Sequence, residues 1–282
     1  MKNSDLHTHS YYSDGEYSPT EVVKLAKKRK IKNLALTDHN SIDGVEEAIK
    51  EGNKVGVNVI PAVEIIGNGF EVLGYFINYK DSKMKKELLR CGYYQNEVVK
   101  RIINLLRGEG EDISFEKLKE QFPDADKNYN YAHLFYYLMS KGYEFQEALD
   151  KVMETKKKIK KPDKRDISVI SAIKLIKKYK GVPVLSHPWI GKEDFTMENV
   201  KKYVKAGLKG IEYENGEKNF VGRDGDFKKK MKGFAKRYGL ILTQGSDFHG
   251  PIMISALKRH ELGKYNCDEK IVEKLKKLKE KR

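Results

Sequence analysis

Short apolar runs alternate with helical patterns along most of the chain, and this alternation limits the possible folds more than any other feature. Strands are predicted at residues 33–37, 57–60, 69–77, 182–185, 210–213 and 240–243. Helices are predicted between them, at residues 19–30, 44–51, 168–180, 197–205 and 227–238. Strands that alternate with helices are typical of parallel sheets. The sequence therefore predicts an α/β fold.

The alternation stops between residues 82 and 166, where every pattern is helical. Helices are predicted there at residues 84–107, 114–121, 132–141 and 145–158, followed by a basic run at 156–165. We expect an α/β unit formed by residues 1–81 and 167–282, with an α-helical insert at 82–166 that covers its functional face. An amphipathic helix at 268–281 is expected to pack on the outside of the α/β unit, with partner binding as the alternative.

The composition excludes several classes of protein. With 282 residues, 39% of them hydrophobic and 34% charged, the chain can form a core but is too polar for a membrane protein. We expect no spanning helix and no secretion signal, and hence a cytoplasmic location. Cys91 and Cys267 lie far apart and have no CxxC partner, so a metal site would have to use histidine and carboxylate ligands.

The formal net charge is +15. A positive field raises the local concentration of anions, which favours phosphorylated metabolites, nucleotides or nucleic acid as partners. Solvated, lysine-rich helix faces are the alternative explanation. Neither a membrane nor an obligate protein partner is expected.

Five of the seven histidines follow predicted strands. They are His7, His9, His39, His187 and His249. The carboxyl ends of the strands form the functional face in parallel α/β folds, so these side chains are expected to meet there. His7 and His9 occupy positions i and i+2 of an extended segment and therefore point to the same side.

Three carboxylates, Asp14, Glu64 and Asp247, stand at similar places. Glu64 follows an apolar run, where an unpaired carboxylate is costly. Together the five histidines and three carboxylates exceed the three or four ligands that one zinc ion needs, so two or three ions of Zn, Mn or Fe are expected. Clustered ions polarise phosphoryl oxygens and generate hydroxide near neutral pH, which indicates hydrolysis, most suitably of a phosphoester.

Six segments that carry these residues stand in order along the chain. They are residues 5–10 (DLHTHS), 12–15 (YSDG), 36–39 (LTDH), 62–65 (AVEI), 186–188 (SHP) and 245–250 (GSDFHG). Together they resemble the successive motifs of the PHP (polymerase and histidinol phosphatase) family, in the family's order. The helical insert is similar to that of the branch containing nucleotide phosphatases and 5′→3′ exonucleases that act on short oligonucleotides.

The resemblance implies a distorted (β/α)7 barrel with two or three divalent metal ions at the carboxyl ends of its strands. The implied ligands are His7, His9, Glu64 and Asp247 for one ion; Glu64, His187 and the residue at position 71 for a second; and Asp14, His39 and His249 for a third. Glu64 would therefore bridge two ions.

Two positions differ from the family pattern. Glu71 stands where the family usually has histidine; it can still ligate a metal, with a preference for a harder ion such as Mn, or it is a solvated strand residue. Tyr131 stands where the branch typically has an arginine, two residues before His133. His133 is expected to bind the substrate phosphate or to protonate the leaving oxygen, and packing within a helix is the alternative.

Because that arginine is missing, other cations must face the substrate anion. The candidates are Arg101, Lys160, Arg165, Lys218 and Arg223, with solvated surface charge as the alternative. The tyrosines of the insert are candidates for stacking on a base, with packing in the core as the alternative. They are Tyr93, Tyr94, Tyr129, Tyr131, Tyr136 and Tyr137.

The sequence therefore predicts a metal-dependent phosphoesterase. The expected substrates are nucleoside monophosphates, 3′,5′-bisphosphate nucleotides or short oligonucleotide ends, attacked by metal-bound hydroxide without a covalent enzyme intermediate. A histidinol-phosphate phosphatase is the alternative enzyme. A non-catalytic metal-binding module that associates with nucleic acid or a polymerase is the alternative outside the enzymes.

Overall fold

The computed structural model describes residues 2–125, 128–159, 167–190, 194–214, 225–257 and 260–280. Four of the predicted phosphate-binding cations, Lys160, Arg165, Lys218 and Arg223, lie outside these ranges. None of the helices formed by the described residues combines the length and the apolar character needed to cross a bilayer.

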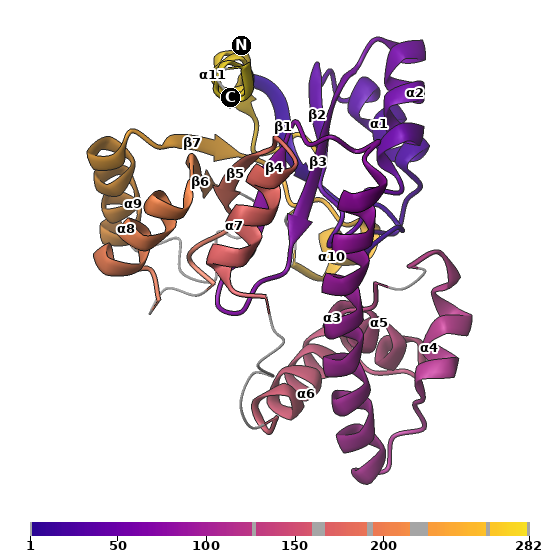
Figure 1. The fold of residues 1–282 in the computed structure, drawn as a ribbon. Helices are drawn as coiled ribbons and strands as arrows, with labels where there is room; N and C mark the ends of the chain where they lie inside the picture. Colours follow the sequence, from indigo (N-terminus) through magenta and orange to yellow (C-terminus); the bar gives the residue numbers. More distant parts are fainter. Residues whose placement is uncertain are drawn as a thin grey trace.

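Eight strands of the described chain form one nearly closed sheet (Figure 1). They are β1 (Lys2–Thr8), β2 (Asn33–Leu36), β3 (Asn58–Ile65), β4 (Val72–Tyr75), β5 (Val182–Leu185), β6 (Gly210–Glu214), β7 (Ile241–Gln244) and β8 (Cys267–Asp268). Their spatial order is β7-β6-β5-β4-β3-β2-β1-β8. Thr8 at the end of β1 also forms a parallel bridge with Phe248, just after β7, so the sheet curls into a barrel. The predicted α/β barrel is confirmed.

The four-residue strand β4 departs from the parallel arrangement. The pairs β1–β2, β2–β3, β5–β6 and β6–β7 are parallel, whereas β4 runs antiparallel to both β3 and β5. Only residues 66–71 connect β3 to β4. A parallel crossover needs a dozen residues or more, so this short connection requires a hairpin. The two-residue β8, which pairs antiparallel to β1, was not predicted.

Helices of the described chain cover the outside of the barrel (Figure 1). They are α1 (Pro19–Lys28), α2 (Val45–Val55), α7 (Val169–Lys178), α8 (Met197–Ala206) and α9 (Gly225–Tyr238). Outward-facing strand residues such as Val63 and Leu185 pack in one apolar cluster with Ile173 and Ile176 of α7. These strands thus bury their outer faces under a helix, as the alternation of patterns predicts.

Helix α11 (Glu269–Glu280) packs differently from the prediction. Alternate residues of β3, among them Ile60 and Ala62, fill the barrel interior, and Val272 and Leu275 of α11 belong to the same cluster. The helix therefore covers one end of the barrel, and the prediction that it packs on the exterior is wrong. Its apolar stripe indicates a buried face but does not indicate which surface buries it. In Figure 1, α11 and both chain ends lie at the end of the barrel opposite the insert.

The helical stretch consists of α3 (Ser82–Gly108), α4 (Phe115–Gln121), the short 3₁₀ helix at Pro123–Ala125, α5 (Tyr131–Ser140) and α6 (Phe145–Lys157). Helix α3 spans 27 residues and takes part in two cores. Met84 in its first half packs with the outer cluster of the barrel, and Ile103 in its second half packs in a separate cluster with the other insert helices. Helix α10 (Pro251–Leu257), which was not predicted, contributes Ile252 to that second cluster.

Candidate metal centre

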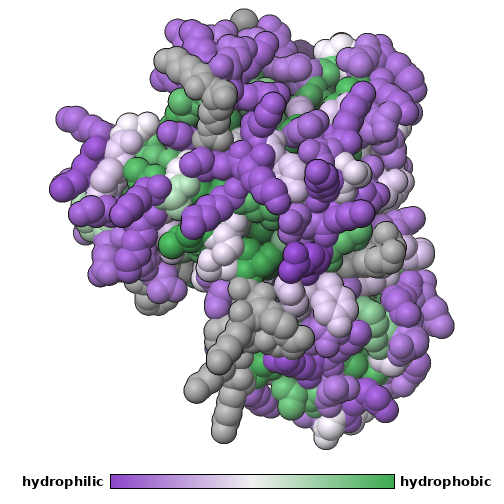
Figure 2. All heavy atoms as spheres, in the orientation of Figure 1, coloured by the Kyte–Doolittle hydropathy of each residue, from purple (hydrophilic) through white to green (hydrophobic). Residues whose placement is uncertain are grey.

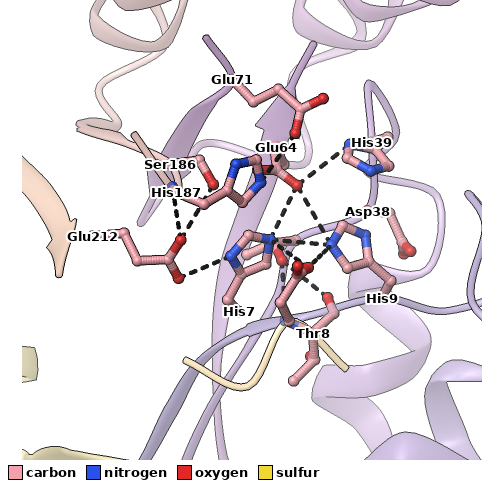
Figure 3. A network of polar contacts seen from close by, with 12 residues as sticks. His7, Thr8, His9, Asp38, His39, Glu64, Glu71, Ser186, His187 and Glu212 are labelled. Atoms are coloured by element: carbon pink, nitrogen blue, oxygen red, sulfur yellow. Dashed lines mark hydrogen bonds and ion pairs between the residues drawn. The ribbon is translucent and has the colours of Figure 1, made fainter. Parts of the chain in front are cut away.

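The nine side chains predicted as metal ligands converge at one end of the barrel. They are His7, His9, Asp14, His39, Glu64, Glu71, His187, Asp247 and His249. The elements that carry them are β1, β3 and the loops after β1, β2, β3, β5 and β7, so residues from both ends of the sequence meet here. Eight of the nine are buried, and the Glu71 side chain is only 13% exposed. Figure 3 shows most of them pointing toward a common centre.

The tightest group is formed by His7 and His9. Their Nε2 atoms lie 3.1 Å apart. Glu64 Oε2 lies 3.0 Å from the first and 3.4 Å from the second, and Asp247 Oδ1 lies 3.3 Å from both. Four ligand atoms bound at about 2.1 Å around one ion in a tetrahedron are about 3.4 Å from one another. The five distances that involve the two histidine nitrogens are therefore close to those of a metal site.

Glu64 connects this group to a second one. Its other oxygen, Oε1, lies 3.2 Å from His187 Nε2. Glu71 Oε2 lies 3.1 Å from the same nitrogen. The carboxylate at position 71 is therefore placed where it can share an ion with His187, although its role as a ligand stays a prediction.

Asp14 is the centre of a third group. Its Oδ1 lies 3.4 Å from His249 Nε2 and 3.8 Å from His9 Nδ1, and its Oδ2 lies 3.6 Å from His39 Nε2. His9 thus faces the first group with Nε2 and the third with Nδ1. The three groups share side chains and form one continuous cluster.

Several buried atoms of the cluster lie 3.2–3.4 Å from an ionisable partner without forming a hydrogen bond in the described part of the chain. They are Asp14 Oδ1, His39 Nδ1 and Glu64 Oε1. Leaving such an atom unpaired costs about 1–3 kcal/mol, so the arrangement calls for another binding group. Imidazole nitrogens and carboxylate oxygens are suitable ligands for Zn, Mn and Fe. The donor set therefore fits divalent metal ions.

The carboxylates of the cluster also raise the pKa values of its histidines His7 and His9. Burial by itself lowers the pKa of His7, but the negative charges of Glu64, Glu212 and Asp247 outweigh it and hold that pKa well above its ordinary value. Burial likewise lowers the pKa of His9, while hydrogen bonds with Asp247 and Glu64 raise it to about 10. The space between the two rings therefore attracts positive charge, whether protons or metal ions.

Glu212 in β6 is a functional residue that the sequence analysis missed. Its buried carboxylate lies 3.0 Å from His7 Nδ1 and accepts a hydrogen bond from the backbone N–H of His187 at 2.9 Å (Figure 3). A carboxylate accepts hydrogen bonds only, so it keeps a proton on Nδ1 and leaves the Nε2 lone pair of His7 facing the cluster. The available signal was a glutamate within an apolar strand, where a charge needs partners.

Replacing Glu212 by glutamine is expected to weaken metal affinity by roughly 10–100-fold, because the amide no longer fixes the orientation of His7. Competitive chelator titration measures this loss. The matched control is Glu214→Gln, two residues along the same strand, whose partly exposed carboxylate pairs with Lys228 instead. Equal affinities for the two variants would contradict the role given to Glu212.

The insert reaches the cluster through the loop that follows β1. Asp38 fixes this loop by accepting hydrogen bonds from the Ser10 backbone at 2.7 Å and from Ser13 Oγ at 2.8 Å. Asn130, the N-cap of α5, donates from Nδ2 to Asp14 Oδ2 at 2.7 Å. The position of Asp14 therefore depends on both the barrel and the insert.

His133 lies in the first turn of α5 and is 2% exposed. Its Nδ1 accepts a hydrogen bond from the Asn130 backbone N–H at 3.1 Å, and its Nε2 donates to the Ser13 carbonyl at 2.9 Å. Nδ1 thus completes the N-terminal cap of α5, and Nε2 holds the insert on the barrel, which agrees with the packing alternative. The side chain also borders a cavity of about 540 Å³ beside Asp14, and a direct role on the substrate stays a prediction.

A second cavity, of about 320 Å³, lies between the barrel and the insert. Its lining includes Glu71 and His187 of the cluster together with Arg101, Tyr131 and Lys156 of the insert. Arg101 is a member of the predicted cation set, whereas Lys156 was recognised only as part of a basic run. Figure 2 shows apolar side chains bordered by hydrophilic ones where the barrel and the insert meet.

The six candidate tyrosines of the insert divide into three sets, of which the first is Tyr93 alone, a residue that is 55% exposed. Tyr94 and Tyr131 line the 320 Å³ cavity, which places them where a base could stack. Tyr129, Tyr136 and Tyr137 are buried in the core of the insert, in agreement with the packing alternative.

Comparison with known proteins gives a consistent picture. A family model described as PHP domain matches residues 5–164. The chain is 29% identical over 260 residues to a 5′-3′ exoribonuclease of Haemophilus influenzae, covering 89% of this chain and 91% of that protein. It is 26% identical over 265 residues to a 3′,5′-nucleoside bisphosphate phosphatase of Chromobacterium violaceum, covering 89% and 88%.

Among solved structures, a candidate metal-dependent phosphoesterase of Bifidobacterium adolescentis superposes with a TM-score of 0.81. The match covers 96% of this chain and 94% of that chain, at 21% sequence identity. This likeness concerns the fold and extends over both the barrel and the insert.

Proposed function

The chain belongs to the PHP domain family, whose model matches more than half of it, and on this basis we propose that it is a metal-dependent phosphoesterase acting on nucleotides or short oligonucleotides. The family assigned from the six motifs is thereby confirmed. The observation that carries the proposal is the group around His7 and His9, whose Nε2 atoms lie 3.0–3.4 Å from each other and from one oxygen each of Glu64 and Asp247. The names of the two curated relatives supply the class of substrate.

The nine clustered side chains are proposed to hold two or three ions of Zn, Mn or Fe. Bound ions of this kind polarise a phosphoryl oxygen and lower the pKa of a water molecule to near neutrality. The chain itself supplies the positioning: Glu64 spans two of the ligand groups with its two oxygens, and His9 spans two with its two nitrogens. Glu212 keeps His7 oriented toward the first group.

The insert, residues 82–166, is proposed to cover the site and to select the substrate, while residues 1–81 and 167–282 form the barrel that carries the chemistry. Two contacts support this division of roles. His133 and Asn130 hold α5 against the loop that contains Asp14. The 320 Å³ cavity has walls from both parts and reaches His187.

A substrate panel tests the proposal. Purified protein loaded with Mn is assayed on a nucleoside 5′-monophosphate, a nucleoside 3′,5′-bisphosphate, a short 5′-phosphorylated RNA and histidinol phosphate. We expect phosphate or mononucleotide release from the nucleotide substrates, abolished by a chelator and restored by Mn.

Three outcomes of this panel would overturn the proposal. Preferential turnover of histidinol phosphate would identify the alternative enzyme. Turnover that survives exhaustive chelation would exclude the metal-dependent mechanism. Salt-sensitive RNA binding by metal-loaded protein without any turnover would identify a non-catalytic module.

A further inference from the structure

Lys156 lines the cavity between the barrel and the insert. It lies near the end of α6, and the same cavity is lined by Glu71 and His187. Other lysines in this region pair with carboxylates: Lys151 with Glu111 and Lys158 with Glu109, each at 2.6 Å. In the described part of the chain, no carboxylate forms such an ion pair with Lys156.

An aromatic ring holds Lys156 in place of a carboxylate. Its Nζ lies 4.2 Å from the centroid of the Tyr131 ring, well within the range of a cation–π contact. The ring face attracts the ammonium group without neutralising its charge. The three N–H donors of Lys156 therefore remain suited to an external anion. The same cavity wall carries Tyr131 where the resemblance implied an arginine, so α6 supplies a positive charge beside that position.

We propose that Lys156, held against Tyr131, binds a second anionic group of the substrate, separate from the ester phosphate at the metal centre. This inference rests on the proposed function and makes Lys156 a specificity-determining residue. The ligand class is a phosphate ester that carries an additional phosphate, either on the same ribose or on the next nucleotide. Tyr94, Val98 and Ile159 line the same cavity and offer apolar contacts to the organic part of such a molecule.

Two substrates that differ by one phosphate provide the test. The ratio of kcat/KM for a nucleoside 3′,5′-bisphosphate to that for the matching 5′-monophosphate is measured in wild type and in Lys156→Met, which keeps an unbranched, flexible side chain. We expect the ratio to fall by at least about tenfold, mainly through KM, because a charge-assisted contact is lost. Lys156→Arg is expected to retain most of the preference, and Tyr131→Leu to lose part of it.

The matched control is Lys157→Met. Lys157 is the next residue of the same helix and is exposed, so this variant removes the same charge without changing the cavity. Its ratio is expected to stay within about twofold of wild type, since exposed charges are screened. Equal ratios in wild type and in a folded Lys156→Met protein would overturn the proposal, as would an equal fall in both lysine variants.

If the chain is not a phosphoesterase, the experiment gives a result that differs from a failure of the Lys156 proposal. Wild-type protein that hydrolyses neither substrate contradicts the phosphoesterase assignment rather than the role of Lys156. Calorimetric titration with the same two compounds then tests Lys156 directly. A weaker affinity of Lys156→Met for the bisphosphate supports the anion site, and an unchanged affinity overturns it.

Discussion

Replacing His9 by alanine is expected to lower kcat/KM by at least about 10³-fold while the protein stays folded. His9 faces two ligand groups at once: its Nε2 lies 3.3 Å from Asp247 Oδ1, and its Nδ1 lies 3.8 Å from Asp14 Oδ1. Alanine therefore removes a ligand from each group, whereas the strands around it keep their apolar packing. The measurements are steady-state kinetics on the best nucleotide substrate and bound metal per chain.

Thermal unfolding provides the control for this variant. The melting transition of His9→Ala protein is expected to stay cooperative, while its metal content falls together with its activity. Wild-type turnover in the variant would contradict the metal centre. The same holds for a variant that unfolds yet still retains its full complement of metal.

Replacing Gly245 by alanine is expected to lower the free energy of unfolding by about 3 kcal/mol, at the upper end of the usual cost of overpacking. A Cβ atom at Gly245 would collide with the backbone and Cβ of His7. The loop has little freedom to move away, because Ser246 N–H donates to Asp5 Oδ1 at 2.8 Å and Asp247 N–H to the His7 carbonyl at 2.8 Å. Since β1 and this loop both carry ligands, metal affinity is expected to fall as well.

The chain offers a matched control for this substitution. Gly233 lies on the exposed side of α9, and a Cβ atom there would meet nothing within 4 Å. Gly233→Ala is therefore expected to stabilise the protein by about 0.5–1 kcal/mol, as alanine does within a helix. Urea unfolding compares the two variants. Similar free energies of unfolding for the two variants would show that the close approach of the β7 loop to β1 is not required for stability.

The order of strands and helices could be predicted because each element buries a face whose period is visible in the sequence. The strand at 182–185 has the predicted bounds, and the helices of the insert agree within a few residues. The antiparallel direction of β4 depends on a short connection, and the position of α11 depends on which surface remains uncovered. Such features belong to the assembled fold and leave little trace in local patterns.

The candidate metal centre also contains residues that local sequence patterns reveal and residues that only the assembled fold reveals. His7, Glu64 and Asp247 could be found because histidine and carboxylate residues at strand ends carry their chemistry in their type and position. Glu212 was not predicted, because its role depends on a contact with His7, which lies 205 positions away in the sequence. The sequence shows Lys156 only as one member of a basic run, because its contact with the Tyr131 ring depends on the fold.

The most direct test of the metal centre is anomalous diffraction from crystals grown with Mn and measured at the Mn, Fe and Zn absorption edges. We predict two or three anomalous peaks within bonding distance of the clustered side chains, with Glu64 contacting two of them. Active protein whose crystals show no such peak among His7, His9, Glu64 and Asp247 would contradict the account.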